Sequence, residues 1–276
     1  MGFSVNTNIG ALNAYRNLSI TQDSQSKSLE KLSSGLRINR AADDAAGLSI
    51  AEGLRSQVNG FNVAARNAQD GISLVQTAEG ALGEAQSILQ RMRDLAVQGA
   101  NDTNNADSRA AIDNELAALG EELGRIATGT NFNGIDLLTN AASTTPLSIQ
   151  VGTDAAATSQ IEVGRADLET VAGTVTGLSV SDATTAQGSI TTIDAAIKSV
   201  STSRSDLGAV QNRLEYAVRN INVSAENLAS AESRIRDVDM AKEMMNFTRA
   251  NILSQAGTAM LAQANQAPQG VLQLLG

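Results

Sequence analysis

The sequence has 276 residues and a net charge of −9, and it contains no cysteine, no histidine and no tryptophan. Without cysteine and histidine the chain has no thiol nucleophile, no imidazole base, and no zinc or iron–sulfur site built from such ligands. Only 2% of the residues are aromatic while 42% are hydrophobic, which favours thin helix–helix contacts over a thick globular core. We therefore expect no enzyme, no cofactor and no metal site.

Charge is spread unevenly along the chain. The sum is +3 over residues 1–40 and +1 over residues 241–276, which leaves −13 for the middle. An acidic middle argues against nucleic-acid binding, which needs a basic face. No run of apolar residues is long enough to predict a membrane span, and residues 1–8 do not resemble a secretion signal peptide.

Residues 1–40 predict an amphipathic helix, because apolar residues recur at steps of three and four. The stripe is thin and is interrupted over residues 21–28, so we expect the helix to be marginal on its own. Its members are Ile9, Leu12, Tyr15, Leu18, Leu29, Leu32 and Leu36.

Asp43 and Asp44 stand just before the next periodic run. Two adjacent carboxylates suit acid–base chemistry or a metal site. They also suit a helix start, where a carboxylate accepts hydrogen bonds from free backbone N–H groups and meets the positive end of the helix dipole. We favour capping.

Two heptad runs follow, separated by a polar break. Residues 45–98 carry apolar residues at alternating steps of four and three, which predicts a helix roughly 80 Å long. After residues 99–105 the same spacing returns over residues 112–126. The short connection predicts that this second helix folds back antiparallel, and the turn residues of 129–134 end it.

The segment 141–189 is dominated by Thr, Ser, Ala and Gly, and it has too few large apolar residues for a separate domain. Short alternating pieces at 147–151 and 161–163 predict small β-hairpins.

The most regular pattern is a seven-residue ladder in residues 190–240, with a second row of mostly small residues three positions later. It predicts a coiled-coil seam within a helical bundle. The ladder consists of Ile193, Val200, Leu207, Leu214, Ile221, Leu228 and Ile235.

Residues 241–276 again predict an amphipathic helix. Their methionines suit core filling or a soft binding surface, and we favour core filling. The two prolines, Pro146 and Pro268, are expected outside helices. The apolar residues of this segment include Phe247, Leu253, Met260, Leu272 and Leu275.

The expected fold class is therefore mainly α, a long coiled-coil bundle or rod formed by residues 41–140 and 190–240, with 141–189 as a small hairpin region. The bundle would bring the marginal helices 1–40 and 241–276 side by side. Such helices gain order by packing with further copies, and a heterologous interface that does not close produces a filament.

Several long motifs resemble those of bacterial flagellin, over about residues 1–140 and 190–276. They are KLSSGLRIN at 31–39, AADDAAGL at 41–48, NAQDGIS at 67–73, QTAEGAL at 76–82, QRMRDLAVQ at 90–98, NFNG at 131–134, AESRIRDVD at 231–239 and LQLLG at 272–276. With only about fifty residues between the two regions, we expect a minimal flagellin without large outer domains.

The resemblance implies a structural subunit of the extracellular bacterial flagellum, whose terminal helices form the inner core of the filament. It implies export through the flagellar type III apparatus with a dedicated chaperone, and contact with hook-associated and cap proteins.

The resemblance also implies that the vertebrate Toll-like flagellin receptor recognises the free subunit through a surface that serves inter-subunit contacts as well. From the residues alone, Leu95 suits the bundle seam and Arg91 a solvated rim. An arginine four residues before a leucine also resembles an interface hot spot; the residues alone favour the seam and rim, and the motif resemblance favours recognition. The implied positions are Gln90, Arg91, Arg93, Asp94, Leu95, Gln98 and Glu115.

Two alternatives remain for the whole chain. A hook–filament junction protein shares flagellin-like ends, although the intact segment 90–98 argues against it. A coiled-coil signalling or translocator module is the other, and its two ends would not need each other.

Overall fold

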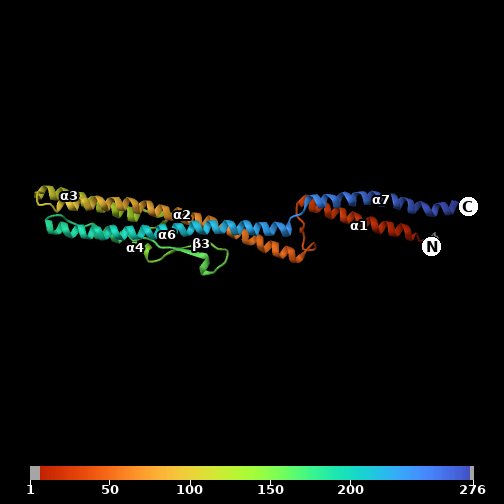
Figure 1. Cartoon of the computed structure of the whole chain (residues 1–276), viewed down its shortest axis with the longest axis horizontal. Helices are drawn as coiled ribbons and strands as arrows, with labels where there is room; N and C mark the ends of the chain where they lie inside the picture. Colours follow the sequence, from red (N-terminus) through yellow and green to blue (C-terminus); the bar gives the residue numbers. More distant parts are fainter. Residues whose placement is uncertain (1–6, 274–276) are drawn as a thin grey trace. The chain divides into compact units, whose positions relative to one another are not determined.

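The computed structural model describes the backbone of residues 7–273 and the side chains of residues 7–266. The predicted fold class is confirmed: long helices pack in pairs, α1 with α7 and α2 with α6, and two small β-hairpins accompany them (Figure 1). The chain divides into two compact units, Met1–Ser56 with Asn227–Gly276, and Gln57–Glu226. No helix in the described part is both long and apolar enough to cross a membrane.

The first unit contains the pair formed by α1 (Ile9–Ser34) and α7 (Met240–Gln273). α1 is continuous through residues 21–28, although the apolar stripe is interrupted there. The side chain of Asn8 caps its start, and Gly35 ends it with a φ of 72°, the left-handed conformation that glycine adopts without a Cβ clash. α7 continues through Pro268, so the expectation that this proline lies outside a helix is wrong.

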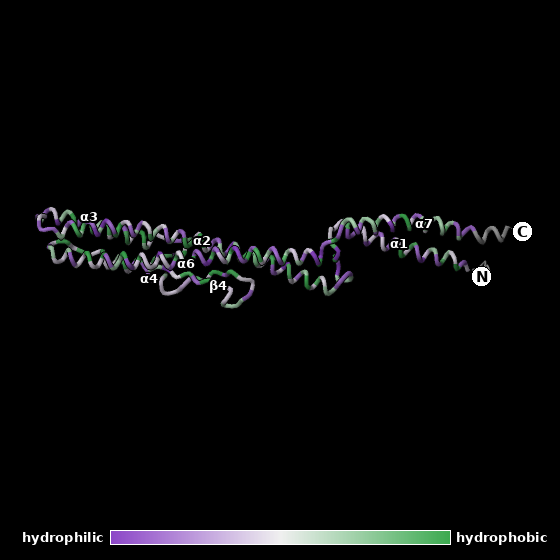
Figure 2. The backbone as a smooth tube through the Cα atoms, viewed as in Figure 1, coloured by the Kyte–Doolittle hydropathy of each residue, from purple (hydrophilic) through white to green (hydrophobic). Residues whose placement is uncertain are grey.

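The second unit is built on the two longest helices, α2 (Ala45–Gly99) and α6 (Ala183–Arg236), which also extend into the first unit. α3 (Ala106–Gly129) follows the predicted break at residues 99–105. Apolar and polar residues alternate along these helices (Figure 2). Within the α6 ladder, the positions from Ile193 to Ile221 are all buried, whereas Leu228 and Ile235 are half-buried. Five of the seven ladder positions are thus buried in the subunit.

The segment between α3 and α6 is richer in structure than its composition predicts. The hairpin of β3 (Leu147–Gln150) and β4 (Gln160–Val163) is confirmed, with Leu147 opposite Val163. A second hairpin, missed by the sequence analysis, pairs two-residue strands, and a short helix precedes α6. These further elements are β1 (Asn131–Phe132), β2 (Ile135–Asp136), α4 (Asn140–Ser143), the 3₁₀ turn η1 (Ala157–Ser159) and α5 (Leu168–Val175).

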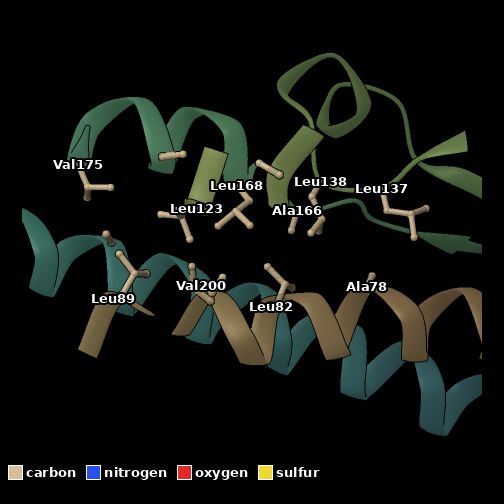
Figure 3. Close-up of a cluster of buried hydrophobic side chains, with 14 of the residues drawn as sticks. Ala78, Leu82, Leu89, Leu123, Leu137, Leu138, Ala166, Leu168, Val175 and Val200 are labelled. Atoms are coloured by element: carbon tan, nitrogen blue, oxygen red, sulfur yellow. The ribbon is translucent and has the colours of Figure 1, made fainter. Parts of the chain in front are cut away.

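This segment completes the core of the second unit. Leu137, Leu138 and Leu168 pack against the long helices, on the side of α2 that carries Leu82 and Leu89 (Figure 3). All five side chains are almost fully buried. The leucines of this segment supply the largest side chains of the contact, and small residues such as Ala78 and Ala166 are buried in the same cluster. Together they explain why the segment folds onto the bundle.

Candidate assembly and recognition surfaces

A junction of backbone hydrogen bonds closes the end of the α1–α7 unit. The amide of Arg37 donates to the carbonyl oxygen of Arg236 at 2.6 Å, and the amide of Val238 donates to the carbonyl oxygen of Gly35 at 3.1 Å. The guanidinium of Arg37 donates to the carbonyl oxygen of Ile235 at 2.5 Å. The end of α1 is therefore tied to the α6–α7 connection, which holds the two terminal helices beside each other.

Of the two predicted caps, Asp44 caps the start of α2, whereas Asp43 holds the loop before it. The Oδ1 of Asp44 accepts the amide of Gly47 at 2.8 Å, across the first turn of α2. The carboxylate of Asp43 accepts the amides of Arg40 and Asn39 at 3.0 and 3.1 Å, and these hydrogen bonds lower its pKa. In residues 7–273 no three Asp or Glu side chains gather in a way that would hold a metal ion.

The α1–α7 pair buries few large side chains. Leu18 is buried against the close approach of Gly257, and Ala250 is buried on α7. Asn8 adds one hydrogen bond from its Nδ2 to the carbonyl oxygen of Ala264 at 2.8 Å. Large apolar side chains elsewhere on both helices remain 49–65% exposed: Ile9, Leu12, Tyr15, Ile20, Leu29, Met240, Met244, Met245, Ile252, Leu253 and Met260.

The predicted terminal-assembly residues whose side chains are described therefore fall into three groups. Leu18 belongs to the contact between α1 and α7, and Leu32, Leu36 and Phe247 are half-buried. Ile9, Leu12, Leu253 and Met260 are exposed. Leu272 and Leu275 lie outside the described side chains. The methionines of α7 do not fill a core within the single subunit, because the helix α1 covers only one side of α7.

Of the predicted recognition residues, Arg91 and Glu115 are joined directly. The Nη2 and Nε of Arg91 donate to the same Oε1 of Glu115, at 2.7 and 3.0 Å, which links α2 to α3. Both side chains remain about half exposed. Gln90, Asp94 and Gln98 are exposed on α2 as well. The result is an exposed, charged contact between two neighbouring helices.

Two other predicted residues, Leu95 and Arg93, do not take part in this contact between α2 and α3. Leu95 is only 2% exposed and belongs to the core of the bundle. A direct receptor contact through this side chain does not fit its burial in the core. Arg93 reaches α6, where its Nε donates to Asp194 at 2.7 Å. Asp194 was missed, because 101 residues separate the pair and no local pattern signals it.

Comparison with known proteins agrees with this structure. The bacterial flagellin N-terminal helical region matches residues 5–144, and the bacterial flagellin C-terminal helical region matches residues 190–275. Only residues 145–189 lie between them, so the chain has no large outer domain between its two helical regions.

Relatives that align over nearly the whole chain are also flagellins or flagellar filament proteins. The chain is 54% identical over 271 residues to a flagellin of Halalkalibacterium halodurans, covering 98% of this chain and 99% of the relative. It is 48% identical over 303 residues to a flagellin of Bacillus subtilis, with the same coverage. A flagellar filament 33 kDa core protein of Treponema phagedenis is 46% identical, again over 98% of this chain and 99% of the relative.

Solved structures share the fold. Bacillus cereus flagellin superposes with a TM-score of 0.51 at 36% identity, over 60% of this chain and 94% of that one. A putative flagellar hook-associated protein of Vibrio parahaemolyticus has a TM-score of 0.58 at 13% identity, over 71% of this chain and all of that one, and shows the fold alone. The chain belongs to the bacterial flagellin family, the structural and non-enzymatic subunits of the extracellular flagellar filament.

Proposed function

We propose that this flagellin polymerises through the exposed apolar faces of α1 and α7 to form the filament that serves motility. The supporting observation is the row of large apolar side chains that these helices leave exposed. A soluble monomer rarely carries such a surface without a partner, because covering apolar area releases free energy of about 25 cal/mol per Å². Copies of the same chain supply the partner.

Seeded elongation of purified subunits tests this proposal. Ile252→Glu and Leu253→Glu each place a charge on the exposed face of α7 without touching a buried side chain. We expect both to slow elongation by at least about tenfold, because a charge in a dry contact is costly. Ala155→Glu adds the same charge in the exposed loop between β3 and β4 and serves as the matched control.

Removal of residues 1–40 or of residues 241–276 is a coarser version of the same test. Each truncation deletes one partner of the α1–α7 pair, and we expect neither shortened chain to polymerise. Filaments that grow from either one would contradict assembly through the terminal helices. The assay also separates a filament subunit from a hook–filament junction protein, which would not elongate into long filaments.

We further propose that the free subunit is recognised by the vertebrate Toll-like flagellin receptor at the exposed contact between α2 and α3. The motif at residues 90–98 supports this proposal through its family resemblance. The pairing of Arg91 with Glu115 supports it physically, because the carboxylate fixes an exposed arginine in one orientation before binding. Leu95 would contribute by holding α2 in the bundle.

Receptor activation by purified monomers distinguishes these roles. Arg91→Ala is expected to raise the half-maximal concentration about tenfold or more, as for an arginine hot spot. Glu115→Ala is expected to have a smaller effect in the same direction, since it frees the arginine without removing it. Arg125→Ala is the control, because Arg125 is at least as exposed as Arg91 and is likewise paired with a glutamate, Glu122 of α3. Unchanged activation by Arg91→Ala would refute the proposed site.

The export chaperone, the type III export apparatus, and the hook-associated and cap proteins are further proposed partners, supported by the family resemblance. An exposed apolar α7 is a suitable target for a chaperone before assembly. Binding of a purified flagellin export chaperone to the full chain, compared with the chain lacking residues 241–276, tests the first of them. Equal binding by both chains would exclude α7 as the target.

A further inference from the structure

Four methionines share a single exposed helix. Met240, Met244, Met245 and Met260 of α7 are 49–64% exposed, whereas Met92 in the core is fully buried. Met244 and Met245 also line an open apolar groove with Ile252 and Leu253. The chain contains no cysteine and no tryptophan, so the thioether of methionine is its most oxidisable side chain.

We propose that the exposed methionines of α7 are oxidation sites through which two-electron oxidants such as hydrogen peroxide control assembly of the subunit. The sulfur lone pair attacks one peroxide oxygen, and the O–O bond breaks. The sulfur is oxidised by two electrons to the sulfoxide, and the second oxygen leaves as water after taking up both hydrogens. Sulfoxide formation is reversed by methionine sulfoxide reductases, so the modification acts as a switch.

The effect on assembly rests on the proposed function, in which this face of α7 is covered by other subunits. A sulfoxide replaces an apolar thioether with a polar oxygen that needs a hydrogen-bond partner. The neighbours that line the groove offer one hydroxyl, on Thr248, and one guanidinium, on Arg249, among apolar side chains. Oxidised subunits should therefore add to a filament more slowly, whereas methionines already covered in a filament should resist the oxidant.

Peptide mass spectrometry on peroxide-treated monomers tests the sites themselves. We expect the four α7 methionines to be oxidised at least about ten times faster than Met92, which serves as the internal control. Similar rates at Met92 and at the α7 positions in the folded monomer would overturn the assignment, whatever the protein does in assembly.

Seeded elongation tests the consequence. Peroxide treatment should slow elongation of the natural chain about tenfold, and methionine sulfoxide reductase should restore it. A variant with Met240, Met244, Met245 and Met260 all changed to leucine should elongate at the same rate before and after treatment, since leucine fills a similar volume and is not oxidised. Met92→Leu should remain as sensitive as the natural chain. Equal loss in the fourfold variant would overturn the switch.

Treatment of preformed filaments separates this inference from the proposed function. Protection of the α7 methionines in filaments supports both. Oxidation as fast in filaments as in monomers would refute burial of this face during assembly and remove the switch, but would leave the monomer oxidation sites established.

Discussion

Asp44 shows how one side chain decides where a long helix begins. Its carboxylate accepts the amide of Gly47, a donor that has no partner within the first turn of α2. Asp44→Ala is expected to lower the free energy of unfolding by about 1 kcal/mol, measured by urea denaturation of the monomer. Asp44→Asn keeps an acceptor oxygen and should lose less than half as much. An equal loss for both variants would mean that the charge, and not the hydrogen bond, sets the effect.

Glu30 near the end of α1 and Asp43 in the loop before α2 make the stability of this region depend on pH. Hydrogen bonds from Asn39 and Arg40 lower the pKa of Glu30, and the amides of Arg40 and Asn39 lower the pKa of Asp43. A carboxylate with a lowered folded-state pKa contributes stability above its unfolded pKa, near 4 for both groups, and loses it as the pH falls through the folded value.

The urea midpoint of the natural chain should therefore fall as the pH drops below about 5, and less steeply in Asp43→Asn, which cannot gain that proton. Asp70→Asn removes an exposed carboxylate of α2 and serves as the control. Parallel pH profiles for the natural chain and Asp43→Asn would contradict the assigned hydrogen bonds.

A contact could be predicted from the sequence only where its two residues lie close together along the chain. The caps at Asp44 and Asn105 involve an amide only three residues away, so a local pattern is sufficient to find them. The contacts of Arg93 with Asp194 and of Arg37 with Ile235 join residues 101 and 198 positions apart. They depend on how the helices are packed, which residue spacing alone does not define.

At the scale of elements, heptad spacing predicted where the long helices lie but placed their first and last residues less accurately. α6 begins at Ala183, seven residues before the predicted start, because the carboxylate of Asp182 accepts the amides of Thr184 and Thr185. α5 was missed because three of its eight residues are glycine or threonine, and so short a helix shows little periodicity. Its stability comes from burying Leu168 and Val175 on the bundle.

Helix α2 offers two glycines with opposite surroundings. A Cβ on Gly99 would lie 2.6 Å from the Cβ of Val180, a buried residue whose amide is held by Asp113. Gly99→Ala is therefore expected to destabilise the monomer by about 1–3 kcal/mol through overpacking. Gly80 has open space around its Cβ position, and Gly80→Ala should stabilise the helix by about 0.5–1 kcal/mol.

Thermal and urea unfolding of the two variants gives a direct comparison, because both substitutions are chemically identical and lie in one helix. A stabilising effect of Gly99→Ala would show that the loop carrying Val180 moves aside without cost. It would also mean that the close approach is not needed to hold the segment between α5 and α6.

At the scale of the whole molecule, the two units differ in how much core each contains. The second unit has a continuous cluster of buried leucine, isoleucine, valine and alanine side chains from α2, α3, α5 and α6. In the α1–α7 pair, by contrast, Leu18, Ser28 and Ala250 are the buried side chains of the described residues. Helices with so little buried area gain most of their stability from further packing.

This difference predicts a characteristic pattern of amide hydrogen exchange. In the monomer, amides of α1 and α7 should exchange at least about a hundred times faster than those of α2 between residues 75 and 96, because local opening there exposes little apolar surface. After polymerisation, α1 and α7 should become protected, since neighbouring subunits cover the side chains that the monomer exposes. Protection of α2 should change little by comparison. Terminal helices that are already strongly protected in the monomer would show that the α1–α7 pair is stable on its own, and would place the driving force for assembly elsewhere in the chain.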